Sequence, residues 1–433
     1  MKVAIYTLGC KVNQYETQAM EQELLARGHT LTEFSDEADA YIVNTCSVTA
    51  VSDQKSRQVI HGVQRKHPGA VVAVCGCYPQ THADDVRKLG VDLISGTGDR
   101  TGFIRLLEEA AAEKRQIEAI DQPFERRVFE VLPAGGLGGR TRAMLKVEDG
   151  CVNFCTYCII PYARGRVRSL PVPTAVEQTR ALAAEGYREI VVTGIEISSW
   201  GQDLKNGETL IDLLEAVCTA APAVRIRLGS LEPRTITEEF CRRAAALPNL
   251  CPQFHLSMQS GCDDTLKRMN RKYDTTRYAQ SVALLNQYFD HPAVTTDLIT
   301  GFPEETEEEF AQTLDFIRRC GFAQMHIFPY SRRQGTPAAG MPGQIPNGEK
   351  ARRAHQGAEL ARAMEKSWLS SWMGQRVSVL FEEEKDGFWR GYTPQYIEVR
   401  GKGENLHNRV CPVTLTAVGE GVAFGVVTEE EAP

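Results

Sequence analysis

Long hydrophobic runs are absent from this sequence of 433 residues. No stretch approaches the roughly 18 consecutive apolar residues of a membrane-spanning helix. The short apolar run after Met1 is typical of a β-strand and not of a signal peptide. These absences argue against membrane insertion and against export. With 42% hydrophobic and 24% charged residues, the chain has the composition of a globular protein long enough for several domains.

A strong net charge is also absent. The chain carries 49 Lys and Arg against 56 Asp and Glu, which gives a net charge of −7 at neutral pH. An acidic chain has no overall attraction to nucleic acid. Any contact with RNA must therefore come from a local basic surface.

Cysteine, in contrast, is abundant, because the chain has 13 of them. Without a secretion signal, so many cysteines argue against a framework of disulfides and for metal or redox chemistry in a reducing compartment. The cytosol is the expected location.

Strand and helix signals alternate over residues 2–95. Hydrophobic patterning predicts strands at 2–9, 38–45 and 70–76 and helices at 16–28 and 52–68. Such alternation indicates an α/β fold with a doubly wound parallel sheet. Cys10, Cys46 and Cys77 each directly follow a strand. Because the carboxyl ends of parallel strands share one edge, we expect these three cysteines to converge, whereas Cys75 should point into the core.

The alternation resumes after a Gly-rich segment at residues 133–140, which is typical of a flexible linker. Six further strands are predicted, separated by helical segments, at residues 143–149, 189–195, 224–230, 254–260, 293–299 and 323–329. Six units are too few for a closed eight-stranded barrel but fit a partial, TIM-like (β/α)6 barrel. The chemistry of such a barrel lies at the carboxyl ends of its strands.

Three closely spaced cysteines, Cys151, Cys155 and Cys158, follow the first of these six strands in the stretch CVNFCTYC. A structural zinc site needs four ligands, usually in pairs, and a redox dithiol needs only two. Three thiolates suit a [4Fe-4S] cluster, because they hold three irons and leave the fourth open to a small chelating ligand.

Residues from about 370 to the end change to short β-runs parted by Gly and Pro, which predicts a small five-stranded barrel. Aromatic and basic residues interleave there as they do on RNA-binding surfaces, and the candidates for RNA contact are Trp389, Arg390, Arg400 and Lys402, among Phe388, Tyr392 and Tyr396. This region is nevertheless net acidic, so a purely structural barrel remains the alternative.

CxxxCxxC at the start of a partial barrel resembles the radical S-adenosylmethionine superfamily. The resemblance extends along essentially the whole chain and narrows to the methylthiotransferase family, with the GCKVNQYE start most similar to its MtaB type. The blocks that carry it are TLGCKVNQYET, VNTCSV, CGCYPQ, EDGCVNFCTYCIIPYARGRVRS, TGIEISSWG, LGSLEP, HLSMQSGCDDTLKRMNRKY, TDLITGFP and FPYSRRQGTPA. One departure is Glu304, where the family more usually has Gly.

The resemblance implies three domains, at residues 1–125, 137–368 and 370–433, the last similar to a TRAM domain, an OB-like module that binds tRNA. In the family, three N-terminal cysteines bind a second [4Fe-4S] cluster, which maps onto Cys10, Cys46 and Cys77. All six cysteines would then be metal ligands and catalytic. The implied cofactors are two [4Fe-4S] clusters and S-adenosylmethionine.

The implied reaction adds a methylthio group to C2 of N6-threonylcarbamoyladenosine at position 37, in the anticodon loop of tRNA. One S-adenosylmethionine methylates a sulfur on the second cluster, and another yields the 5′-deoxyadenosyl radical that removes the C2 hydrogen. A reductant such as flavodoxin or ferredoxin is implied, the sulfur donor is not identified, and no membrane partner is expected. Isopentenyladenosine in tRNA, a ribosomal protein side chain, or a non-enzymatic iron-sulfur protein that binds RNA are the alternatives.

The resemblance also suggests contacts to S-adenosylmethionine, although ordinary barrel loops would explain the same residues. The candidates are Thr193, Gly194, Ser230, Glu232, Gln259, Arg271, Phe328 and Tyr330. Tyr157 is expected to offer only its backbone beside the cluster.

Three arginines recur at every second position in ARGRVRS: Arg164, Arg166 and Arg168. If this segment is extended, the three side chains share one face and are candidates to meet tRNA phosphates. A solvated basic loop or internal ion pairs are the alternative.

Overall fold

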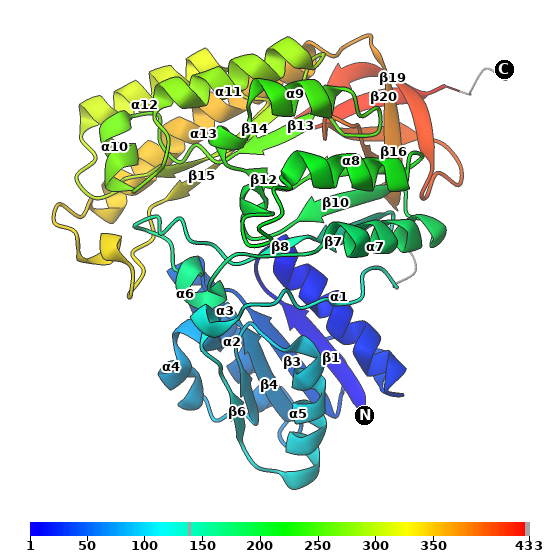
Figure 1. Cartoon of the computed structure of the whole chain (residues 1–433), viewed down its shortest axis with the longest axis vertical. Coiled ribbons are helices and arrows are strands. Elements are labelled where there is room, and N and C mark those ends of the chain that lie inside the picture. The colour runs from blue at the N-terminus through cyan, green and yellow to red at the C-terminus, as the bar shows by residue number, and fades with distance from the viewer. Residues whose placement is uncertain (137–139, 429–433) are drawn as a thin grey trace.

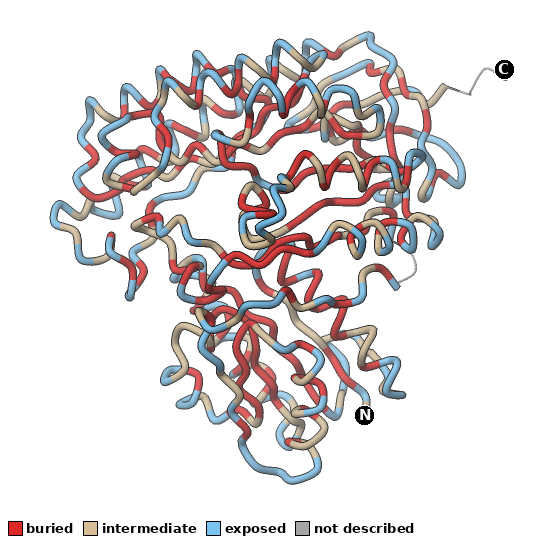
Figure 2. The backbone as a smooth tube through the Cα atoms, in the orientation of Figure 1, coloured by how far each residue is buried: buried red, intermediate tan, exposed pale blue. Residues whose placement is uncertain are grey.

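The computed structural model describes residues 1–136 and 140–428, so residues 137–139 of the predicted Gly-rich linker lie outside the described residues. Figure 1 shows an N-terminal α/β layer, a central layer of strands and helices, and a small C-terminal barrel. The central strands of the layers are mostly buried, as Figure 2 shows in red. Over the described part of the chain, none of the helices is both long and apolar enough to cross a membrane.

The N-terminal layer is a six-stranded sheet in the order β2-β1-β3-β4-β5-β6, with every pair of neighbours parallel. The predicted doubly wound sheet is confirmed. The strands β2, β5 and β6 were not predicted because three residues are too few to show a period. The strands are β1 (Lys2–Thr7), β2 (Thr30–Thr32), β3 (Ala40–Thr45), β4 (Val71–Gly76), β5 (Leu93–Ser95) and β6 (Ile117–Ala119). The helices are α1 (Lys11–Ala26), α2 (Ala50–Lys66), α3 (Cys77–Thr81), α4 (Ala83–Arg87) and α5 (Arg100–Glu113).

Helix α1 begins at Lys11, so the predicted start at residue 16 is wrong. The first turns of the helix are buried on more than one side, because α1 lies between the N-terminal sheet and strand β7 of the central layer. Polar residues such as Asn13 and Glu16 are as buried there as Val12 and Tyr15. An apolar stripe on one face, which is the usual signal of a helix, is therefore missing.

The central layer is the predicted partial barrel, made of the sheets β11-β10-β7 and β12-β13-β14-β15 with parallel neighbours throughout. All six predicted strands are present. Its strands are β7 (Arg142–Lys146), β10 (Glu189–Thr193), β11 (Arg225–Leu228), β12 (Ser230–Leu231), β13 (Gln253–Leu256), β14 (Ala293–Thr300) and β15 (Gln324–Pro329). The helices are α6 (Ile160–Arg164), α7 (Val172–Ala184), α8 (Leu210–Ala220), α9 (Glu238–Ala245), α10 (Asp263–Arg268), α11 (Thr275–Tyr288) and α12 (Glu307–Cys320). A two-stranded ribbon, β8 (Glu148–Asp149) with β9 (Arg168–Ser169), brackets the CVNFCTYC loop.

Glu304 has a backbone conformation that favours glycine, with a φ of 63°. Its N–H donates to the carbonyl of Gly343 at 2.9 Å, which keeps the turn before α12 in place. A positive φ favours glycine, since a side chain costs conformational free energy there, so the departure at Glu304 falls on a turn that glycine would adopt more easily.

The helix α13 (Asn347–Ser370) leads to the C-terminal barrel, which closes in the order β16-β17-β18-β20-β19 and confirms the predicted five strands. These are β16 (Arg376–Lys385), β17 (Phe388–Tyr392), β18 (Glu398–Lys402), β19 (Val410–Val418) and β20 (Ala423–Val427). The barrel docks at the start of β11, where Arg225 donates to the carbonyl of Tyr392 at 3.0 Å and Arg227 to that of Pro394 at 2.8 Å.

The carboxyl edges of the N-terminal sheet and of the partial barrel face each other. Beyond β3, Asp53 forms a buried ion pair at 2.5 Å with Arg333, which lies beyond β15. Beyond β5, Thr97 donates to the carbonyl of Ala163 in α6 at 2.6 Å. Because ligands collect at the carboxyl edges of parallel sheets, two such edges in contact define one place for chemistry.

Candidate functional site

Cys10, Cys46 and Cys77 come together at the carboxyl edge of the N-terminal sheet, as the strand pattern predicts. Cys10 directly precedes α1, Cys46 follows β3, and Cys77 opens α3 after β4. Gly9 passes so closely that a β-carbon there would lie 3.2 Å from the sulfur of Cys46. The packing of the loops thus depends on that missing side chain.

The three thiols influence one another electrostatically. Burial raises the pKa of Cys77 to about 12, with Cys46 and Cys10 adding to the rise against the opposing effect of Arg164. Burial likewise raises the pKa of Cys46. As free thiols, both groups keep their protons at neutral pH, and a bound metal has to displace those protons. Cys75, in contrast, is completely buried in the core of the sheet, as predicted.

Cys151, Cys155 and Cys158 form a second group in the loop after β8. Burial raises the pKa of Cys158 to about 12, and the neighbouring Cys155 adds to that rise. Burial also raises the pKa of Cys151, with Cys158 and Cys155 contributing. The Arg271 guanidinium donates to the Cys155 sulfur at 3.1 Å, which brings a permanent cation beside this group.

Both groups have the donor atoms of an iron-sulfur cluster. Over residues 1–136 and 140–428, no group of three His, Cys, Asp or Glu side chains is arranged to hold a single metal ion. Each of the two groups offers three cysteine sulfurs, which can hold three irons of a [4Fe-4S] cluster and leave the fourth iron open.

Acidic and basic groups surround the second cysteine group. Burial raises the pKa of Glu196 to about 7 despite the opposing charge of Arg271, and one of its carboxylate oxygens is buried without a hydrogen-bond partner. Asn153 donates to the other oxygen of Glu196 at 3.5 Å. The negative charge of Glu232 adds to the rise in the pKa of Glu196, although Glu232 is itself paired with Arg234 at 2.8 Å. A zwitterionic ligand could pair its ammonium group with these carboxylates and its carboxylate with the Arg271 guanidinium.

The predicted cofactor residues differ in their burial and in their contacts. Arg271 contacts Cys155, whereas Thr193 is buried at the end of β10. A β-carbon on Gly194 would meet a Glu148 oxygen at 2.9 Å. Ser230 is exposed and Gln259 is half-buried with a φ of 66°.

The two predicted aromatic walls differ in exposure. Phe328 is exposed on β15, where it is free to face a ligand. Tyr330 is buried with Met269 and Phe302, and the side chain of Tyr157 packs against this cluster. Tyr157 and Tyr330 both contact the ring of Phe302, so the side chain of Tyr157 contributes packing.

The prediction that Arg164, Arg166 and Arg168 share one RNA-facing side is wrong. Arg164 ends helix α6 and is fully buried, Arg168 is buried in β9, and only Arg166 is exposed. Because the segment is not extended, the alternation that the prediction assumed does not apply. The alternative prediction of internal ion pairs is confirmed for Arg164, which pairs with Glu16, and for Arg168, which pairs with Asp149.

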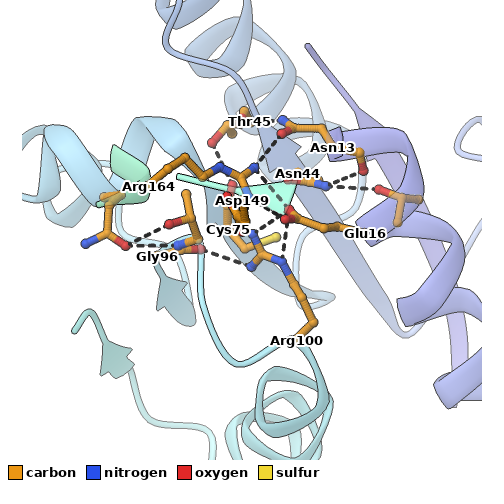
Figure 3. A network of polar contacts seen from close by, with 12 residues as sticks. Asn13, Glu16, Asn44, Thr45, Cys75, Gly96, Arg100, Asp149 and Arg164 are labelled. Atoms are coloured by element: carbon orange, nitrogen blue, oxygen red, sulfur yellow. Dashed lines mark hydrogen bonds and ion pairs between the residues drawn. The ribbon is translucent and has the colours of Figure 1, made fainter. Parts of the chain in front are cut away.

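Arg164 belongs to a buried network around Glu16 that joins the two halves of the site (Figure 3). Its guanidinium pairs with Glu16 of α1 and donates to the side-chain oxygen of Asn13 at 2.9 Å. Glu16 is also paired with Lys146 at 3.0 Å and with Arg100 at 3.1 Å. Burial alone would raise the pKa of Glu16, but the three cations lower it well below its ordinary value.

Asn13 connects this network to the first cysteine group. Its amide donates to the carbonyl of Leu8 at 2.8 Å and to that of Thr45 at 2.9 Å. Those carbonyls lie just before Cys10 and Cys46, so one side chain holds both loops. Asn13 and Glu16 lie in the block CKVNQYE, but their roles were not predicted because an amide and a carboxylate in a helix usually face solvent.

In the C-terminal barrel, the predicted RNA residues lie on opposite faces. Trp389 packs against the barrel core and donates to the carbonyl of Gly403 at 3.0 Å. Arg390 and Arg400 are directly opposite each other on neighbouring strands, and each has a carboxylate partner, Glu383 at 3.3 Å and Glu398 at 3.4 Å. Lys402 lies over the ring of Phe388 at 5.3 Å.

Comparison with known proteins places this arrangement in a family. Residues 2–96 match the model described as uncharacterized protein family UPF0004, and residues 145–317 match the radical SAM superfamily. The threonylcarbamoyladenosine tRNA methylthiotransferase MtaB of Bacillus subtilis is 38% identical over 99% of this chain and 97% of its own. That of Aquifex aeolicus is 34% identical over 93% and 97%. This chain belongs to the MtaB-type radical SAM methylthiotransferases.

The family also has members with another named substrate. The tRNA-2-methylthio-N(6)-dimethylallyladenosine synthase of Pelotomaculum thermopropionicum is 32% identical over 99% of this chain and 98% of its own. The resemblance seen in the sequence blocks is thus confirmed at the level of the family. Relatives named for two different adenosines therefore match almost the whole length of this chain.

A solved structure supports the fold of this methylthiotransferase. The radical S-adenosylmethionine methyltransferase TsrM of Kitasatospora setae has a TM-score of 0.57 over 78% of this chain and 76% of its own, at 16% identity. Family membership implies S-adenosylmethionine and [4Fe-4S] clusters as cofactors, and the two groups of three cysteines have the donor chemistry for them.

Proposed function

We propose that this chain adds a methylthio group to C2 of N6-threonylcarbamoyladenosine at position 37 of tRNA. The observation that carries the proposal is that two groups of three cysteines lie at the carboxyl edges of two sheets that contact each other, in a chain that is 38% identical to an enzyme named for this substrate. The same chemistry on a dimethylallyl adenosine is the second candidate, favoured by the relative that is 32% identical over 99% of the chain.

Each half of the site has its own task in this proposal. When bound, a cluster on Cys151, Cys155 and Cys158 supplies the electron that cleaves S-adenosylmethionine, and one on the other group carries the sulfur. The chain itself positions both groups. Asn13 holds the loops of the first, while Arg164 and Glu16 connect α1 to the helix that follows the second.

The charges beside Cys155 support a site for the cofactor's amino acid end. Arg271 provides the partner for a carboxylate and is held by Tyr273 at 3.0 Å and by the Ser257 carbonyl at 3.2 Å. The unpartnered oxygen of Glu196 is an acceptor for an ammonium group. We place Thr193, Gly194, Ser230, Glu232, Gln259 and Phe328 around this pair as further contacts.

Replacing Arg271 with Leu should therefore weaken the binding of S-adenosylmethionine. A charge-assisted hydrogen bond to a carboxylate contributes about 1.5–3 kcal/mol, so the KM for the cofactor should rise by roughly tenfold to a hundredfold. The measurement is 5′-deoxyadenosine release at a series of cofactor concentrations, with iron content measured in parallel. Arg277→Leu, which removes a guanidinium bonded to the carbonyl of Ile236, is the control. An unchanged KM in a variant with full iron content would contradict the assignment.

The choice of tRNA can be tested by competition. The reconstituted, reduced enzyme is offered equal amounts of tRNA carrying threonylcarbamoyl adenosine and tRNA carrying dimethylallyl adenosine, and the digested nucleosides are analysed by mass spectrometry. We expect the methylthio mass on the threonylcarbamoyl nucleoside. Modification of the dimethylallyl nucleoside alone would favour the second candidate substrate. Release of 5′-deoxyadenosine without either modified nucleoside would show that tRNA is not the substrate.

The remaining partners follow from this chemistry. Reductive cleavage of the cofactor needs a one-electron donor, for which flavodoxin or ferredoxin is proposed. A substrate that is cytosolic tRNA places the enzyme in the cytoplasm.

A further inference from the structure

Three aromatic side chains, two of them exposed and one half-buried, form a group at the rim of the CVNFCTYC loop. Phe154 lies inside the loop, Tyr162 in α6 and Phe124 in the segment before the partial barrel. The rings of Phe124 and Phe154 are nearly parallel, with centroids 6.2 Å apart and an angle of 8° between planes. Tyr162 stands edge-on to Phe154 at 6.0 Å. Phe154 and Tyr162 are each 39% exposed, which is unusual for large rings packed beside a cysteine group.

The backbone maintains this exposure at a conformational cost. Phe154 has a φ of 48°, a region that aromatic residues rarely occupy. Asn270 donates to the Phe154 carbonyl at 2.9 Å and stabilises the strained conformation. Strain that neighbouring groups stabilise is typical of functional positions. Here it places a ring at the surface between Cys151 and Cys155.

The segment that carries Phe124 is packed tightly against the cluster loop. Gly165 approaches it so closely that a β-carbon there would lie 2.1 Å from the Pro123 carbonyl oxygen. Arg127 donates to the carbonyl of Phe124 through its guanidinium. The three rings therefore belong to one surface and are not separate exposed residues.

Arginines flank this aromatic group. Arg127 and Arg166 are both exposed, and among the described residues neither guanidinium is paired with a carboxylate. Unpaired cations beside exposed rings match the composition of single-stranded nucleic acid sites, in which bases stack on aromatic faces and arginines meet phosphates. Because the whole chain is net acidic, attraction to RNA has to come from a local cationic surface such as this one.

We propose that Phe124, Phe154 and Tyr162 form a stacking platform for an unpaired base next to the target adenosine in the anticodon loop, with Arg127 and Arg166 on the adjacent phosphates. The inference rests on the proposed function, because it assumes that RNA enters this site. It assigns recognition of the anticodon loop to the rim of the catalytic loop.

The experiment compares Tyr162→Ala and Phe124→Ala with Tyr162→Phe, which keeps the ring. Tyr288→Ala is the matched control, because Tyr288 is a partly exposed tyrosine at the far end of α11 that bonds Glu238 at 3.0 Å. Base stacking on an aromatic side chain supports a rise of about tenfold in the KM for tRNA in each Ala variant. The kcat, the iron content and the 5′-deoxyadenosine released without tRNA should stay unchanged. Tyr162→Phe and Tyr288→Ala should behave as the wild type.

A binding measurement tests the platform without chemistry. An anticodon stem-loop with 2-aminopurine beside the target adenosine should lose fluorescence on binding the wild type, because stacking quenches the probe. Tyr162→Ala and Phe124→Ala should lose this quenching, and the effect should not depend on salt. Arg166→Gln should keep the quenching and reduce the slope of log affinity against log salt by about 0.7, as expected for one phosphate of a single strand.

The outcomes separate the platform from the proposed function. Wild-type KM and quenching in both Ala variants, in an enzyme that modifies tRNA, would overturn the platform alone. Quenching that is lost in the variants, in an enzyme that leaves the tRNA unmodified, would uphold the platform and overturn the proposed function. A wild type that does not bind the stem-loop would overturn both.

Discussion

Replacing any one of Cys151, Cys155 and Cys158 with Ala is expected to abolish both 5′-deoxyadenosine release and the methylthio product. Replacing any one of Cys10, Cys46 and Cys77 is expected to abolish only the product. The reason is that Cys151, Cys155 and Cys158 lie with Arg271 and Glu196, which suit the cofactor, whereas Cys10, Cys46 and Cys77 lie at the carboxyl edge of the N-terminal sheet. With two ligands left, each variant should lose one cluster and retain about four of about eight irons.

The measurement combines iron and sulfide counts of anaerobically reconstituted protein with the two product assays. Cys75→Ala is the matched control, because Cys75 is two residues from Cys77 yet completely buried in the core of the sheet. It should keep about eight irons and both activities. Eight irons in the Cys46→Ala variant, or loss of 5′-deoxyadenosine in that variant, would contradict the separation of tasks.

Replacing Glu16 with Gln is expected to destabilise the protein by about 3–5 kcal/mol, since it leaves buried cations without their carboxylate. Glu16 is 1% exposed and binds three cations from three different segments, Lys146, Arg100 and Arg164. Loss of this centre should also disturb the loops of both cysteine groups, so the yield of product per 5′-deoxyadenosine should fall. Unfolding by urea and the ratio of the two products measure these effects.

The stabilisation by Glu16 should also depend on pH. The cations hold the folded pKa of Glu16 well below its ordinary value, so its contribution to stability is complete above the unfolded pKa of about 4.3 and disappears as the pH falls through the folded pKa. The difference between wild type and Glu16→Gln should therefore be large at neutral pH and shrink in acid. Glu23→Gln is the control, because Glu23 pairs with Arg27 at the surface, where an ion pair contributes little to stability at any pH. A constant difference from pH 7 to pH 3 would show that Glu16 acts only through packing.

The sequence predicted most of the fold because its strands are long enough to show their pattern. All six predicted strands of the partial barrel and the five strands of the C-terminal barrel lie where the apolar runs place them, whereas the two-residue β12 was not predicted. The prediction failed where burial does not follow an apolar stripe. Helix α1 starts at Lys11, and its buried Asn13 and Glu16 broke the expected period.

The sequence likewise predicted some residues of the candidate site and missed others. The spacing of Cys151, Cys155 and Cys158, and the position of Cys10, Cys46 and Cys77 after strands, followed from the chain alone, because parallel strands bring their carboxyl ends to one edge. Glu196 was not singled out, because one carboxylate after a strand has many ordinary roles. Its raised pKa depends on burial and on Glu232, against the opposing charge of Arg271, and both residues are distant from Glu196 in the sequence.

What the sequence by itself determined is therefore the set of local patterns: the class of each domain, the two groups of cysteines and the family to which they belong. The tertiary structure decided which charges are buried. Arg164 and Arg166 are two residues apart in one basic run, yet the first is enclosed with Glu16 and the second faces solvent. Whether an arginine meets solvent or a buried carboxylate depends on the packing of α1 against the central layer, and no local pattern contains that contact.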